Sequence, residues 1–169
     1  MACVAQAEIY EDWNAGGGAA AKASVAEWSD TRSSCPLYDD AHFPSAIATA
    51  ASANEDVSAW DVAGVKDFAE AFKTKVDFNG NLNDWDMSGA TSMESMLHDA
   101  TKFNGNVEAW DVSSAITLVN TFRDATKFNG NLAAWDTVAV SDASLMFSGA
   151  SSLDTCNKAR AHTTAVGRR

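Results

Sequence analysis

The chain has 169 residues, of which 46% are apolar and 21% charged, so its composition is that of a protein with a hydrophobic core. The formal net charge of −11 argues against nucleic acid as a partner, because affinity for a phosphate backbone comes largely from Lys and Arg. No apolar run approaches the roughly 18 residues that a transmembrane helix needs.

The first 52 residues are predicted to form an N-terminal cap that is partly helical. Residues 19–28 are good helix formers. Phe43 precedes Phe68 by one full period of a repeating pattern that is described below. Residues 44–51 are therefore predicted to imitate one helix of that pattern, with a proline in its first turn.

Residues 53–152 contain four 25-residue repeats, and this periodicity is the strongest signal in the sequence. The repeated tryptophans are Trp60, Trp85, Trp110 and Trp135. Each is followed directly by an aspartate, and these are Asp61, Asp86, Asp111 and Asp136. Phenylalanine keeps the same step at Phe78, Phe103 and Phe128, and asparagine at Asn54, Asn79, Asn104 and Asn129.

Each repeat is predicted to form a turn, a short strand and a helix. In the second repeat, residues 79–81 read Asn-Gly-Asn, which favours a turn. Residues 82–87 then have apolar side chains at the first, fourth and sixth positions, as in the strand of a leucine-rich repeat. Between Ala90 and Ala100 the apolar spacing changes to that of one helix face.

The predicted fold class is therefore an α/β repeat protein, a short right-handed solenoid similar to leucine-rich repeats. A C-terminal cap with a basic tail would close it over residues 153–169. The Trp and Phe columns are expected to stack inside the core, because each ring buries about 150–250 Å². The predicted helices add further core positions, and these are Phe72, Leu97, Phe122 and Phe147.

The sequence Phe-Asn-Gly-Asn-Leu-x-x-Trp-Asp, followed by a segment rich in Met or Phe that ends in Ala, resembles the BspA-like or DUF285 surface-protein repeat. The clearest stretches are residues 78–100 and 103–125. The resemblance implies a solenoid similar to leucine-rich repeats that is used for binding, and it implies no catalytic residues. Members are usually long arrays on cell surfaces, and the repeat also occurs in unicellular eukaryotes.

The column of four aspartates allows two interpretations. Each Asp is expected to precede a helix, where a carboxylate can accept backbone N–H groups and oppose the helix dipole. A calcium site is the weaker alternative, since carboxylate oxygens suit that ion. The asparagine column is expected to bond from one repeat to the next and to satisfy the backbone of the turns, with a ligand-binding row as the alternative.

Catalytic residues, metal ligands and cofactor sites are not predicted. The three histidines occupy unrelated places in the repeat, and no nucleophile-elbow, zincin or P-loop motif is present. The three cysteines are Cys3, Cys35 and Cys156, and only a bridge between the first two remains open. The chain is therefore expected not to be an enzyme.

The side of the predicted strands offers a low, mixed surface for a protein partner, formed by Asn83, Asp84, Glu108, Ala109, Ala133 and Ala134. We expect a non-enzymatic interaction module, an accessory or linker subunit that docks on a larger assembly. A membrane-associated assembly, for example a photosynthetic one in an alga, is a setting that the occurrence of the repeat allows. The alternative is a cell-surface adhesin or glycan-binding protein. No targeting segment is visible, so the compartment stays open between a chloroplast and the cell surface.

Overall fold

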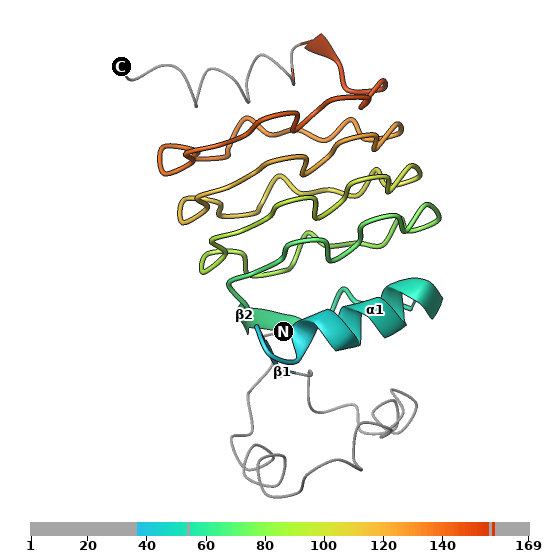
Figure 1. Cartoon of the computed structure of the whole chain (residues 1–169), viewed down its shortest axis with the longest axis vertical. Coiled ribbons are helices and arrows are strands. Elements are labelled where there is room, and N and C mark those ends of the chain that lie inside the picture. The colour runs from blue at the N-terminus through green and yellow to red at the C-terminus, as the bar shows by residue number, and fades with distance from the viewer. Residues whose placement is uncertain (1–36, 54, 156, 158–169) are drawn as a thin grey trace, which may run out of the picture.

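The computed structural model describes residues 37–53, 55–155 and 157 (Figure 1). Its regular elements are β1 (Leu37–Asp39), α1 (Phe43–Ala53) and β2 (Asp61–Gly64). The two strands pair in parallel, and α1 forms the connection between them. No helix in the described residues is long and apolar enough to cross a membrane.

Helix α1 lies against the first repeat and covers one end of the stacked core (Figure 1). Its start is prepared by Asp39, whose Oδ1 accepts the backbone N–H groups of Ala41 and His42, both at 3.1 Å. The buried face of the helix includes Phe43 and Ile47, which are 1% and 2% exposed. The Phe43 ring lies 5.0 Å from that of Phe68. The helix therefore packs on the core as a neighbouring coil would.

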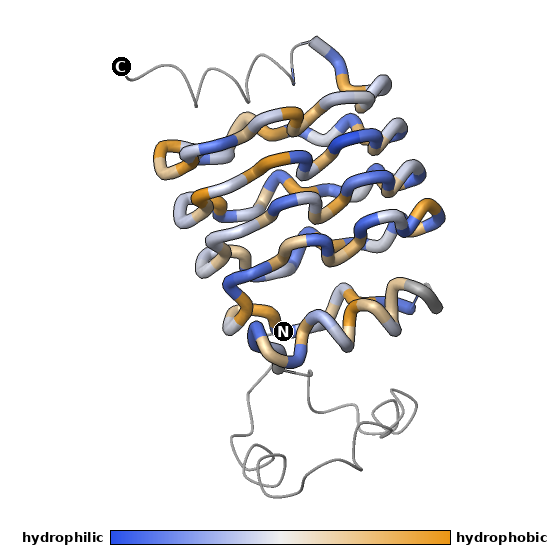
Figure 2. The backbone as a smooth tube through the Cα atoms, viewed as in Figure 1, coloured by the Kyte–Doolittle hydropathy of each residue, from blue (hydrophilic) through white to orange (hydrophobic). Residues whose placement is uncertain are grey.

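Between residues 65 and 154 the chain winds in successive coils, one coil for each repeat, that lie side by side (Figure 1). Isolated parallel bridges join neighbouring coils at one register, and they run from Asp67 to Ser92, Thr117 and Asp142. Apolar and polar residues alternate along the coils (Figure 2). Whether the coils wind with a right hand stays a prediction.

The helix predicted for each repeat is wrong for the described coils. Residues 90–100 instead form consecutive tight turns, in which the N–H of Met96 donates to the carbonyl of Met93 at 3.2 Å. The intervening N–H groups leave the coil, as that of Ser95 does when it donates to the carbonyl of Val119 at 2.8 Å. An α-helix would use all of its interior N–H groups within itself, so it could not bind the neighbouring coil in this way.

Positive φ angles mark the third residue of alternate turns, as a type II turn requires. Ser95 and Asp99 have φ of 55° and 60°. The equivalent non-glycine residues in the other coils are Glu70, Thr74, Asn120, Asp124 and Leu145. Each left-handed residue costs roughly 1–2 kcal/mol, which the backbone bonds between coils must offset.

The strand predicted for each repeat is also wrong beyond the first repeat, where β2 forms. In the second repeat, the N–H of Trp85 donates to the carbonyl of Leu82 at 3.2 Å and closes a turn. The side chains of Asn81 and Asp86 each accept the N–H two residues ahead, at 3.0 Å. Asn and Asp favour such turns over extended strands because they bind their own backbone.

The phenylalanine column stacks inside the coils. The ring of Phe103 lies 5.9 Å from that of Phe78 and 6.0 Å from that of Phe128, nearly parallel to both. The Gly of each Phe-Asn-Gly sequence makes room for the ring, because a Cβ on Gly80 would lie 2.8 Å from Phe78 Cε2. The motif therefore couples a turn to the core.

Candidate functional site

Three of the four repeated tryptophans are buried and bonded between coils. Trp85, Trp110 and Trp135 are 2–3% exposed. Each indole Nε1 donates to a backbone carbonyl of the preceding coil, and the acceptors are Val57 at 2.9 Å, Leu82 at 2.7 Å and Val107 at 2.9 Å. These rings therefore have no free face for a ligand.

The fourth tryptophan, Trp60, is half-buried at the start of the array and packs 4.3 Å from the ring of Tyr38. Burial, and secondarily the charge of Glu55, raises the pKa of Tyr38 to about 12. The phenol therefore stays neutral at physiological pH. The packing of Tyr38 against Trp60 contributes to holding this end of the array.

The positions that the sequence assigns to the inner face of the predicted helices lie in the core of the coils. Phe72, Leu97 and Phe122 are fully buried. The ring of Phe122 stacks 4.0 Å from that of Phe128. Phe147 is half-buried. Its ring lies 5.9 Å from that of Phe122.

The asparagine column forms hydrogen bonds from coil to coil. Asn79 Oδ1 accepts the N–H of Asn104 at 2.8 Å, and Asn104 Oδ1 accepts the N–H of Asn129 at 2.9 Å. Asn129 Oδ1 accepts the N–H of Asp154 at 3.0 Å. Asn54 lies outside the described residues. These amide oxygens are occupied by the protein itself, so they serve the turns rather than a ligand.

The four aspartates that follow the tryptophans cap turns and not helices, which corrects the predicted helix-capping ladder. Each Oδ1 accepts the backbone N–H two residues ahead, at 2.9–3.1 Å, in Asp61, Asp86, Asp111 and Asp136. The side chains of Asp86, Asp111 and Asp136 are also exposed to solvent or a partner. The ladder thus shapes the backbone of the turns.

These aspartates belong to a surface that carries acids and no cations, which we call the acidic face. It comprises residues 55–65, 79–90, 104–115 and 129–140, which contain no Lys, Arg or His. Its acids are Glu55, Asp56, Asp61, Asp84, Asp86, Glu108, Asp111 and Asp136. The basic side chains of the described coils lie in the other segments, at Lys66, Lys73, Lys75, Lys102, Arg123 and Lys127.

Two acids of this face are held in the charged form by neighbouring serines. Hydrogen bonds from the hydroxyl and the N–H of Ser113 lower the pKa of Asp111. Hydrogen bonds from the N–H and the hydroxyl of Ser58 lower the pKa of Asp56 in the same way. These two serines therefore favour negative charge at two places on the acidic face.

The six residues that the sequence proposes for a partner surface all lie on the acidic face. Asn83 is half-buried, and its Oδ1 is buried without a hydrogen bond in the structure. The other five side chains are exposed, and they are Asp84, Glu108, Ala109, Ala133 and Ala134. Glu108 Oε1 accepts a bond from Asn131 Nδ2 at 2.6 Å. The alanines keep this surface low between the carboxylates.

A cluster that sequence reasoning missed lies on the opposite side of the coils. His98 Nε2 lies 3.4 Å from Asp99 Oδ2 and 3.8 Å from Asp124 Oδ2. Within the described coils, this is the one group of three His, Cys, Asp or Glu side chains close enough to hold a metal ion. Arg123 Nε already lies 3.3 Å from Asp124 Oδ2 and neutralises that carboxylate. The recurrence of Asp99 as Asp124 at the same place in the next repeat is the signal that could have revealed the pair.

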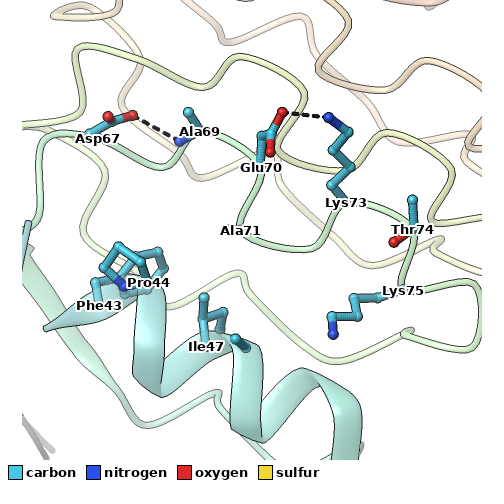
Figure 3. A pocket seen from close by; sticks show the side chains of 11 residues that line it. Phe43, Pro44, Ile47, Asp67, Ala69, Glu70, Ala71, Lys73, Thr74 and Lys75 are labelled. Carbon is cyan, nitrogen blue, oxygen red and sulfur yellow. Dashed lines mark hydrogen bonds and ion pairs between the residues drawn. The ribbon is translucent and has the colours of Figure 1, made fainter.

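A groove of about 470 Å³ separates α1 from the first coil (Figure 3). Phe43, Pro44 and Ile47 line it on the helix side. The opposite wall is the turn segment from Asp67 to Lys75, in which Glu70 and Lys73 form an ion pair. The sequence did not indicate this groove, because the helix was expected to pack as one more repeat.

Several sequence predictions concern residues outside those described. They are the three cysteines, the helix of residues 19–28 and the basic tail of residues 158–169. The possible bridge between Cys3 and Cys35 therefore stays a prediction.

Sequence, aromatic columns and backbone bonds of the coils all recur at the same 25-residue step. The chain belongs to the DUF285 family. The family model described as "Mycoplasma protein of unknown function, DUF285" matches residues 41–159, which is more than half of the chain. The predicted resemblance is thereby confirmed. No curated protein and no solved structure matches the chain.

Proposed function

We propose that this chain is a short solenoid that acts as a non-enzymatic protein–protein interaction module, an accessory or linker subunit that docks on a larger assembly. The acidic face is the observation that carries the proposal. Its carboxylates stand on turns that the backbone holds in place, so a partner meets them with little loss of conformational freedom. Such a surface favours a partner that presents Lys or Arg.

The alternative of a glycan-binding surface has less support. Sugars usually bind against exposed aromatic rings, whereas Trp85, Trp110 and Trp135 are buried and bonded between coils. The exposed alanines of the acidic face form no cleft for a sugar ring. A basic protein surface can instead lie flat against the carboxylates.

The test removes charge from the acidic face without changing its backbone. Asp86→Asn and Asp111→Asn keep an oxygen that can accept the N–H two residues ahead, because Asn forms the same turn as Asp. The matched control combines Glu94→Gln with Asp142→Asn on the other side of the coils, where both side chains are exposed. Each double variant loses two negative charges.

The measurement is the native mass of the tagged full chain in its own cells under mild extraction, with mass spectrometry of the chains that co-elute. We expect the wild type and the control in one complex at fixed stoichiometry, and reduced recovery of that complex with Asp86→Asn/Asp111→Asn. Raising the salt should weaken it further, because the Debye length falls from about 10 Å at 0.1 M to about 3 Å at 1 M. Elution of the wild type as a single chain would contradict the proposal. If both double variants lost the complex to the same extent, the acidic face would not be the docking surface.

A further inference from the structure

The backbone bonds between coils form two sets of opposite direction. At the corners of the coils an N–H donates to the preceding coil, as Thr91 does to Lys66 at 2.8 Å and Lys102 to Val76 at 3.2 Å. Along the row of tight turns, alternate N–H groups donate to carbonyls of the coil that follows in the chain, at 2.8–2.9 Å in the first pair of coils. The donors there are Phe68, Glu70, Phe72 and Thr74, and the acceptors are Ser92, Glu94, Met96 and His98. The next donors are Met93, Ser95, Leu97 and Asp99, followed by Leu118, Asn120, Phe122 and Asp124. Along this row of turns the last coil is therefore the donor end and the first coil the acceptor end.

The last coil presents the donor end. Its N–H groups at the equivalent positions are those of Ala143, Leu145, Phe147 and Gly149, and none has an acceptor among the described residues. Ala143 is exposed, whereas Phe68, Met93 and Leu118 at the same position are at most 1% exposed. Leu145 is 58% exposed. This end of the described array thus combines a row of free N–H groups with apolar side chains.

The first coil presents the acceptor end, at the groove against α1 (Figure 3). The equivalent carbonyls belong to Asp67, Ala69, Ala71 and Lys73, and none receives a backbone N–H from the described residues. Helix α1 covers the apolar part of this end with Phe43 and Ile47. Beyond its first turn, however, a helix uses its N–H groups internally and cannot donate them to a neighbour.

We propose that the two ends are complementary docking surfaces for a second copy of this chain, and that α1 blocks their union. The donor row of one copy would continue onto the acceptor row of the next, as it does between coils. The spacing matches because both rows come from the same repeat, with Ala143 three periods after Phe68. The Phe147 ring would extend the stack that it already forms on Phe122.

The polarity of the row of turns also bears on the form of the assembly. Two donor ends related by a two-fold axis would place the N–H groups of this row against each other, which disfavours a symmetric dimer through this end. A contact between a donor end and an acceptor end is heterologous, and it repeats without closing. While α1 is in place, we expect the chain to be a single copy. After α1 is displaced, we expect a series of oligomers whose size rises with concentration.

The experiment displaces α1 in the full chain. Ala50 is fully buried in the helix interior, so Ala50→Pro should break the helix there. Ile47→Asn is the second variant, because it weakens only the packing of α1. Thr49→Asn is the matched control, since Thr49 is exposed on the same helix. Near-UV circular dichroism of the buried tryptophans identifies the variants that keep their coils.

Sedimentation equilibrium then measures the weight-average mass over a concentration series. We expect 17.9 kDa for the wild type and for Thr49→Asn, and at least twice that mass, rising with concentration, for the folded variants with displaced α1. Adding Ala143→Pro, which removes one N–H of the donor row, should return the mass toward that of one copy.

Three outcomes would overturn the proposal. One is a folded Ile47→Asn variant that remains a single copy, as expected if residues of this chain outside those described cover the donor end. Another is association that Ala143→Pro leaves unchanged, which would indicate non-specific contact through the uncovered apolar end. The third is wild-type association as strong as that of the variants, which would remove the blocking role of α1.

Discussion

The burial of the tryptophan column can be tested at Trp110. Its side chain is 2% exposed, its ring stacks 6.1 Å from that of Trp135, and its Nε1 donates to the carbonyl of Leu82 at 2.7 Å. Trp110→Ala removes the buried ring and leaves a cavity between two coils. We expect the free energy of unfolding to fall by about 3–5 kcal/mol.

A second substitution separates the hydrogen bond from the packing. Trp110→Phe keeps an aromatic ring in the core but removes the indole N–H, so the Leu82 carbonyl loses its donor. An unsatisfied buried acceptor costs about 1–3 kcal/mol, so this variant should lose less stability than Trp110→Ala. The matched control is Ala109→Ser on the exposed neighbour, which should stay within about 0.5 kcal/mol of the wild type.

Urea unfolding followed by near-UV circular dichroism measures these differences, provided that the dependence on urea has the same slope in all variants. A loss below about 1 kcal/mol for Trp110→Ala would refute the argument, because no buried tryptophan is removed at so small a cost. It would place the column outside the core and would restore a binding role for the indoles.

Three further predictions concern single turns. Leu145→Gly should raise the free energy of unfolding by about 1 kcal/mol in urea, since φ is 58° and the side chain is mostly exposed; a loss would show that its apolar contacts outweigh the strain. Gly149→Ala should lower it by about 1–3 kcal/mol, because φ is 75° and the new Cβ would lie 1.9 Å from Asp124 Oδ1; an unchanged midpoint would contradict that geometry. Ser113→Ala should move the pKa of Asp111 back up toward 3.8 in a carbon-13 NMR titration, and an unmoved pKa would disprove the serine bond. Because the folded pKa is the lower one, the bond stabilises the wild type above pH 3.8, and this contribution is lost as the pH falls through the folded pKa.

The periodic positions of the core could be predicted because one spacing serves every coil. Once Trp85 and Phe78 face inward, the residues at the same place in the next repeat face inward too, whatever the local conformation is. The helices and strands could not be predicted in the same way. An apolar residue at every third or fourth position fits a helix face and equally a run of tight turns, so the pattern between Ala90 and Ala100 does not distinguish them.

The candidate surfaces likewise differ in how far the sequence predicts them. The acidic face follows from the sequence, because four segments in register contain no Lys, Arg or His. The cluster of His98 with Asp99 and Asp124, and the groove beside α1, depend on how close neighbouring coils approach. Sequence spacing alone contains no such distances.

The sequence by itself determined the 25-residue period, the family and the separation of charge between the two sides of the coils. Only the tertiary structure decided where each backbone N–H donates. A helix keeps these bonds within one segment, whereas the coils share them alternately between a local turn and a neighbour. That choice depends on a partner in the next coil, almost a whole repeat away along the chain, so it can be made only when the coils pack together.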